Sequence, residues 1–157
     1  MGPKHDERRS TRGVGIRLNV EFRTESVEFR VMISYGGDMM PRKESVLREK
    51  SEKFTTRIIK LYQYLNETKH ERTISNQIYR SGTSIGANIA ESTNAQSRAD
   101  FISKLSIALK EANETEYWLK SLYNGNFIDE KGFSSMFNDN EELIKMLVKS
   151  IKKLKGL

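Results

Sequence analysis

Residues 80–91, with the sequence RSGTSIGANIAE, combine glycines, hydroxyl groups and charged side chains in the way many reactive loops do. The stretch lacks the lysine that follows the glycines of a phosphate-binding loop. A nucleophilic serine would need a base nearby, and neither His5 nor His70 is near in sequence. The residues therefore favour a structural role for this stretch over a catalytic one.

Small residues recur at every fourth position of the same stretch, at Gly82, Gly86 and Ala90. In a helix they share one face, and each mid-helix glycine costs up to about 1 kcal/mol relative to alanine. We expect another backbone or chain to approach this face closely, because only close approach offsets that cost. Membrane dimers use similar spacing, but the charges of Arg80 and Glu91 do not suit a lipid environment.

Basic side chains form two stripes at helical spacing. The first stripe is Lys50, Lys53, Arg57 and Lys60, and the second is Lys145, Lys149, Lys152 and Lys153. With a net charge of +6, they permit an acidic partner such as nucleic acid. Either stripe alone also fits a solvated face with ion pairs, because Glu49 lies four residues before Lys53 and Glu141 four before Lys145. The first and last helices of an up-down bundle are neighbours, so the handedness of the bundle decides whether the stripes merge.

The composition narrows the function further. Cysteine is absent and there are two histidines, so we expect no disulfide, no metal site, no cofactor and no enzyme activity. No stretch approaches the roughly 20 apolar residues of a membrane span. A cytoplasmic protein is the expectation.

Four seams of mainly apolar residues at alternating four- and three-residue spacing predict the elements that carry these side chains. The seams are Leu47, Ser51, Phe54, Ile58, Leu61 and Leu65; Ile74, Ile78, Ile85 and Ile89; Phe101, Leu105, Ala108, Ala112, Thr115, Leu119 and Leu122; and Phe133, Phe137, Asn140, Ile144, Leu147, Ile151 and Leu154. Breaks at 66–69 and 124–126, a capping box at Ser97–Asp100 and a cap at Asp129 separate the helices. Residues 40–157 are thus predicted to form an all-α, antiparallel up-down-up-down four-helix bundle.

Residues 1–39 follow a different pattern and are treated as an N-terminal extension of uncertain structure. Apolar residues alternate with polar ones over 16–22 and 27–35, as in a β-hairpin. An alternative is translated leader sequence from a misplaced start. Gly36-Gly37-Asp38 stands directly before Met39-Met40, and its codons can spell a purine-rich ribosome-binding site.

Two linked motifs resemble the signature of the four-helix-bundle proteins encoded in 23S ribosomal RNA intervening sequences. The first is QIYRSGTSIGANIAE at 77–91, and the second includes Asp100-Phe101-Ile102, ALKEA at 108–112 and ETEYWL at 114–119. The resemblance covers roughly residues 45–155. The same family includes the accessory variability protein of diversity-generating retroelements, which works with a reverse transcriptase and its template RNA. The resemblance implies a homopentamer of antiparallel bundles with nucleic acid as ligand.

The polar signature residues are predicted to form a network, either between the second and third helices or across a subunit boundary. They are Arg80, Ser84, Asn88, Glu91, Glu111 and Glu114. Trp118 lies next to the seam residue Leu119, which favours an interface or core position over base stacking.

Three functions remain open at this point. The leading hypothesis is a non-catalytic, oligomeric nucleic-acid-binding accessory protein, with RNA as the expected ligand. The alternative is a protein-interaction scaffold that partners a reverse transcriptase in a diversity-generating retroelement. A ribosome-associated protein is a distant third.

Overall fold

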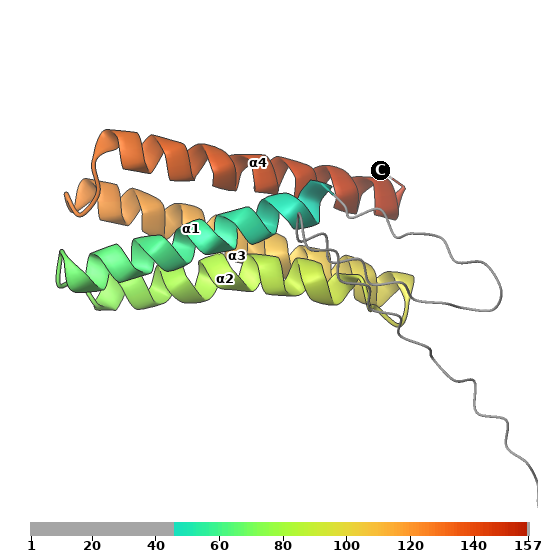
Figure 1. Cartoon of the computed structure of the whole chain (residues 1–157). Coiled ribbons are helices and arrows are strands. Elements are labelled where there is room, and N and C mark those ends of the chain that lie inside the picture. The colour runs from blue at the N-terminus through green and yellow to red at the C-terminus, as the bar shows by residue number, and fades with distance from the viewer. Residues whose placement is uncertain (1–45, 157) are drawn as a thin grey trace, which may run out of the picture. The chain divides into compact units, whose positions relative to one another are not determined.

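The computed structural model describes residues 46–156 and contains four helices: α1 (Val46–Glu67), α2 (Thr73–Ser92), α3 (Arg98–Asn124) and α4 (Glu130–Lys155). Each helix packs on the next one in the chain, and α4 closes the bundle against α1 through a smaller contact. The helices run side by side in alternating directions (Figure 1). The predicted all-α, up-down-up-down bundle is confirmed. The hairpin and leader hypotheses for residues 1–39 lie outside the described residues.

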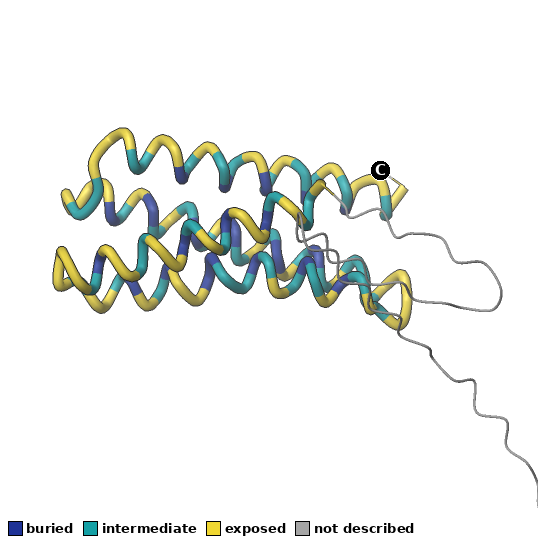
Figure 2. The backbone as a smooth tube through the Cα atoms, viewed as in Figure 1, coloured by how far each residue is buried: buried dark blue, intermediate teal, exposed yellow. Residues whose placement is uncertain are grey.

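Buried residues follow the inward side of every helix (Figure 2). The core contains most of the predicted seam residues, including Phe54, Ile58, Ile85, Leu119 and Leu147. In α4 part of the predicted seam is shifted by one residue from the side of the helix that is buried. Met136 and Leu143 are buried there, whereas Phe137 and Ile144 are only partly covered. The apolar face of α4 thus consists of two adjacent strips, one with Met136 and Leu143 and one with Phe137 and Ile144. The predicted seam followed only the second strip.

Side-chain caps fix where the helices begin. The Ser97 hydroxyl accepts a hydrogen bond from the Asp100 backbone N–H at 3.1 Å, and Asp129 accepts one from the Gly132 N–H at 2.7 Å. Ser97 and Asp129 therefore cap their helices as predicted, although the Asp100 carboxylate of the predicted capping box accepts from the Gln96 N–H rather than from that of Ser97. At α2 the carboxylate of Glu71 accepts from the N–H groups of Thr73, Ile74 and Ser75 at 2.7–2.9 Å. One carboxylate therefore satisfies three free donors at this helix start, where negative charge is also favoured by the helix dipole.

Within residues 46–156 no helix is both long enough and apolar enough to span a membrane.

Candidate nucleic-acid interface and motif surfaces

The glycine face of α2 lies against α1 of the same chain. A Cβ atom built on Gly82 would lie 2.7–2.9 Å from three side-chain carbons of Ile58, and one on Gly86 would lie 2.6 Å from the Thr55 hydroxyl. Such distances are shorter than van der Waals contact, so a side chain at either position requires the Ile58 or Thr55 side chain, or the helices themselves, to move. The glycines set how closely α1 and α2 pack, and they place no reactive group on the surface.

The basic stripe of α1 is largely paired with acidic side chains. The Lys50 ammonium donates to Glu142 of α4 at 2.9 Å, and Arg57 forms an ion pair with Asp139 of α4 and donates to the Ser135 hydroxyl at 2.8 Å. Lys53 pairs with Glu49 on its own helix at 2.6 Å. This hydrogen bond raises the pKa of the Lys53 ammonium and lowers the pKa of the Glu49 carboxyl. Among the described residues, Lys60 is the one member of this stripe without an ion pair.

The basic stripe of α4 differs, because most of its lysines have no acidic partner among the described residues. Lys145 pairs with Glu141 at 2.9 Å, whereas Lys149, Lys152 and Lys153 have no acidic partner within residues 46–156. No acidic residue follows Glu142 in the sequence. Half-buried Ile144 and Val148 lie among these lysines in an open, shallow groove. Within residues 46–156, the last turns of α4 therefore present positive charge without an acidic partner around a small apolar floor.

Acidic side chains of α4 lie against part of the α1 stripe where the two helices meet. Lys50 and Arg57 face Glu142 and Asp139, so the acidic part of α4 lies beside the stripe of α1. The free lysines follow Glu142 and lie nearer the C-terminal end of α4. There Arg98, at the start of α3, donates a hydrogen bond to the Leu154 carbonyl. We call Lys149, Lys152 and Lys153 the α4 lysine cluster.

The predicted network among the polar signature residues is not formed within the described chain. Glu91 pairs with Lys104 of α3 at 2.5 Å and raises the pKa of that ammonium. Asn88 donates to the Ser84 carbonyl at 2.9 Å, and Glu114 accepts from the Trp118 indole N–H at 3.2 Å, both within one helix. Arg80 and Glu111 have no ion pair in residues 46–156.

The buried polar links between helices use other residues. The Thr115 hydroxyl hydrogen-bonds the Ser81 hydroxyl at 2.9 Å, which joins α3 to α2. Asn140 donates to the Ala112 carbonyl at 2.9 Å, which joins α4 to α3. Short side chains at buried positions form these bonds because they lie between the helices, whereas the longer charged side chains reach the surface. Thr115 and Asn140 occupy predicted seam positions, so the sequence indicated that they are buried. Ser81 is not in a predicted seam, and its burial could not be predicted.

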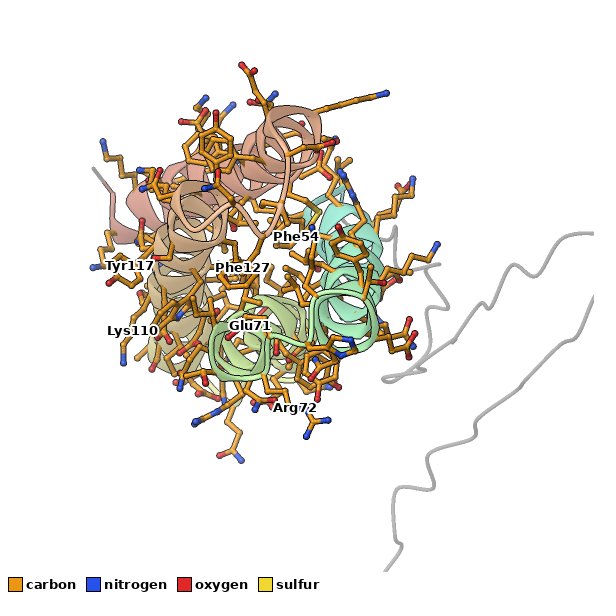
Figure 3. The ribbon with its side chains drawn as sticks, turned by 90° about the vertical axis from the view of Figure 1, so that its left-hand side faces the viewer. Phe54, Glu71, Arg72, Lys110, Tyr117 and Phe127 are labelled. Atoms are coloured by element: carbon orange, nitrogen blue, oxygen red, sulfur yellow. The ribbon has the colours of Figure 1, made fainter. Side chains whose placement is uncertain are left out.

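The side chains of α3 illustrate this division between inside and outside. Lys110 and Tyr117 point outward from α3, while Phe54 of α1 points toward the middle of the bundle (Figure 3). Trp118 is half-buried, and its indole N–H donates to Glu114 of the same helix. Among the described residues there is no group of three His, Cys, Asp or Glu side chains with the arrangement of a metal site.

Comparison with known families matches residues 43–149 to the 23S rRNA-intervening sequence protein family. The chain belongs to this family. The match includes α1, α2, α3 and both motifs, and it extends into α4 as far as Lys149, before Lys152 and Lys153.

A solved structure supports the assignment. The chain is similar to a protein of unknown function from the S23 ribosomal protein family of Bacteroides thetaiotaomicron, with 53% sequence identity and a TM-score of 0.68. The similarity covers 68% of this chain and 99% of that one. Comparison with curated proteins gives no match.

Proposed function

We propose that this family member is a non-catalytic, cytoplasmic accessory protein that assembles with copies of itself, five in number, and binds nucleic acid, RNA above all. The observation that supports it most is the α4 lysine cluster. Its three ammonium groups have no acidic partner among the described residues, while most basic groups of α1 are neutralised.

Uncompensated lysines suit a polyanion because each phosphate contact releases condensed counterions. The α4 lysine cluster lies on the last two turns of a straight helix, so its ammonium groups can follow a phosphate backbone. In an assembly the cluster recurs once in every copy, and the summed field raises the affinity for a long polyanion. Binding of this kind recognises phosphate and shape, and it requires no base-reading motif.

The experiment changes Lys149, Lys152 and Lys153 to Glu in the full chain and measures binding of a single-stranded RNA of about 20 nucleotides by fluorescence anisotropy. The wild-type affinity should fall steeply with salt. The variant should bind at least about tenfold more weakly at low salt, and its slope of log K against log salt should be smaller by about 2, because single strands contribute about 0.7 per lost contact.

The matched control changes Lys69, Arg72 and Lys131 to Glu, which alters the net charge by the same amount. These three exposed residues lie at the other end of the bundle, near the α1–α2 turn and the start of α4. The control should retain most of the RNA affinity. If both variants lost RNA affinity equally, the effect would come from net charge and not from the α4 lysine cluster. Wild-type binding that is absent or independent of salt would rule the proposal out.

A further inference from the structure

The open groove on the surface of α4 combines positive charge with apolar surface. Its floor is aliphatic, and its walls are the side chains of exposed lysines. The residues that line it are Ile144, Val148, Lys145, Lys149, Lys152 and Lys153. The stem of a lysine is apolar as far as its ammonium group, so the walls widen the floor and keep charge at its edge. This surface, which we call the α4 groove, therefore offers one ligand both an apolar and a cationic contact.

The core of the bundle does not need the whole of this apolar floor. The inward side of α4 already carries a row of buried residues, Leu143, Leu147 and Ile151. Val148 follows Leu147 by one residue, which is about 100° of rotation around the helix, and it is half-buried. A polar side chain at this position would leave the buried row intact. The floor is thus available as a contact surface.

The lysines of the α4 groove are spaced to follow a chain of anions. Lys145, Lys149 and Lys153 are four residues apart, so each lies about one turn, or 5.4 Å, beyond the previous one. Their ammonium groups stand on flexible stems and can adjust to the phosphates of an extended strand. Lys149 and Lys153 have no acidic partner within residues 46–156, whereas Lys145 pairs with Glu141. A ligand with an anionic group in every repeating unit fits these walls.

The apolar floor distinguishes a single strand from a duplex. In a duplex the bases are paired and stacked, and phosphates and sugars form most of the outer surface. Unpaired bases can turn outward and lie against protein side chains. Electrostatic attraction alone favours the duplex, because it carries one charge per about 1.7 Å of its axis and each of its strands carries one per about 3.4 Å. A preference for the single strand must therefore come from its bases.

We propose that the α4 groove selects single-stranded over duplex RNA, with an unpaired base resting on Ile144 and Val148 and the flanking phosphates paired with the lysines. The inference rests on the proposed nucleic-acid binding and adds the form of RNA that the site accepts.

An acidic helix of another protein also combines negative charge with apolar groups. Such a helix docks through a row of apolar anchors at i, i+3, i+4 and i+7, which need a long hydrophobic groove. The α4 groove is shallow and has two floor residues on a single helix. It therefore suits one flat base better than the apolar face of a helix.

Three ligands separate the contribution of the bases from that of the phosphates. They are a single-stranded RNA of about 20 nucleotides without internal pairing, an abasic strand with the same number of phosphates, and an RNA duplex of the same length. Fluorescence anisotropy with the full chain at about 50 mM salt should show the single strand bound at least about fivefold more tightly than either of the others. An abasic strand or a duplex that binds as tightly as the single strand would overturn the inference.

Val148→Ser tests the floor without a change of charge. Ile144 is less suitable because it packs against the core. Serine and valine have similar helix propensities, so circular dichroism should show an unchanged helix content. The variant should bind the single strand about three- to fivefold more weakly and the abasic strand as well as the wild type does. Equal losses for both ligands would contradict a contact between the floor and a base.

Val148→Phe is the converse variant, because an aromatic ring provides a surface on which a base can stack. It should strengthen single-strand binding by at least about threefold and leave the abasic strand unaffected. The matched control is Ile59→Ser on α1, since Ile59 is 38% exposed and does not line the groove. This control should keep the wild-type affinities. If it weakens single-strand binding as much as Val148→Ser does, the effect is not specific to the α4 groove and the inference is wrong.

A competition experiment tests the protein partner as an occupant of the groove. A synthetic amphipathic peptide of Glu and Leu is added to the complex of the chain with single-stranded RNA, in an amount equal to that of the RNA. The RNA should stay bound. Complete displacement would assign the groove to an acidic helix and overturn the inference.

This inference and the proposed function fail in different ways. Salt-dependent binding that is equal for all three ligands, and that is lost when Lys149, Lys152 and Lys153 are changed to Glu, would overturn the preference and leave nucleic-acid binding in place. The absence of salt-dependent binding for every ligand would overturn both.

Discussion

Asn140 is a fully buried amide whose two polar atoms are in different situations. Its Nδ2 donates to the Ala112 carbonyl, whereas its Oδ1 has no hydrogen-bond partner among the described residues. A buried acceptor without a partner costs about 1–3 kcal/mol. The bond to α3 thus fixes the position of α4 at the expense of stability, as buried polar residues in helical bundles often do.

We predict that Asn140→Leu stabilises the folded chain by about 1–2 kcal/mol, because it removes the unpaired acceptor and replaces the amide with an apolar side chain of the same branching. The Ala112 carbonyl loses one donor but keeps its bond within α3. Urea unfolding followed by circular dichroism measures the change. Asn138→Leu, at an exposed position two residues earlier, should alter stability by less than about 0.5 kcal/mol. A less stable Asn140→Leu variant would refute the prediction.

The sequence predicts single residues best where burial alone decides their role. Thr115 and Asn140 were assigned to seams from spacing, and both are buried. The sequence alone did not show that the charged signature residues form no network. Spacing tells which side of a helix a residue lies on, but not whether its side chain contacts a residue of the neighbouring helix. Only the packed bundle shows that Arg80 is exposed, that Glu114 is half-buried and that neither forms an ion pair within residues 46–156.

At the scale of elements, the contact of α2 with α1 depends on the missing side chain of Gly82. The three carbons of Ile58 occupy the space where a Cβ would lie. Alanine improves helix propensity by about 1 kcal/mol, but here it forces the two helices apart or displaces a fully buried side chain.

We predict that Gly82→Ala destabilises the chain by about 1–3 kcal/mol, because overpacking outweighs the gain in propensity. A double-mutant cycle with Ile58→Ala should show that the two losses are not additive, since removing the Ile58 side chain makes room for the new methyl group. Ala87→Gly, at an exposed position of the same helix, should cost about 1 kcal/mol from propensity alone. Additive losses in the cycle would show that Ile58 is not the obstacle.

The helices and most of their ends could be predicted from the sequence, since capping residues act locally. The cap at α2 could not be predicted. Glu71 lies before the helix, and its carboxylate accepts hydrogen bonds from the first three backbone N–H groups of α2. The inward direction of α4 was also missed in part. Its apolar residues, including Met136, Phe137, Leu143 and Ile144, form a strip broader than one seam, and packing against α3 and α1 decides which of them are buried.

At the scale of the molecule, charge is distributed unevenly along α4. Asp139 and Glu142 neutralise Arg57 and Lys50 across the α1–α4 contact, and the α4 lysine cluster follows after them. This arrangement could not be predicted, because it depends on which stretch of α4 lies beside the stripe of α1. The ion pairs are more than one-third exposed, so each contributes less than about 1 kcal/mol to stability.

We predict that Asp139→Asn combined with Glu142→Gln strengthens RNA binding by up to about tenfold at 50 mM salt, because it releases Arg57 and Lys50 to contact phosphates. The gain should shrink at 200 mM salt. Fluorescence anisotropy measures both affinities. Glu67→Gln combined with Glu130→Gln removes the same charge at the far end of the bundle and should have a smaller effect. If the two variants behave alike, the position of the acidic residues is irrelevant.

The alternating direction of the four helices also places the start of α1 and the end of α4 at the same end of the bundle, beside the α4 lysine cluster (Figure 1). This has a practical consequence for protein engineering. A tag or fluorescent fusion at the C-terminus emerges next to the candidate binding surface and can mask it. A circular permutant with the ends of α4 and α1 joined by a short linker, and opened at the α3–α4 turn around Gly125, would move both new termini to the opposite end of the bundle.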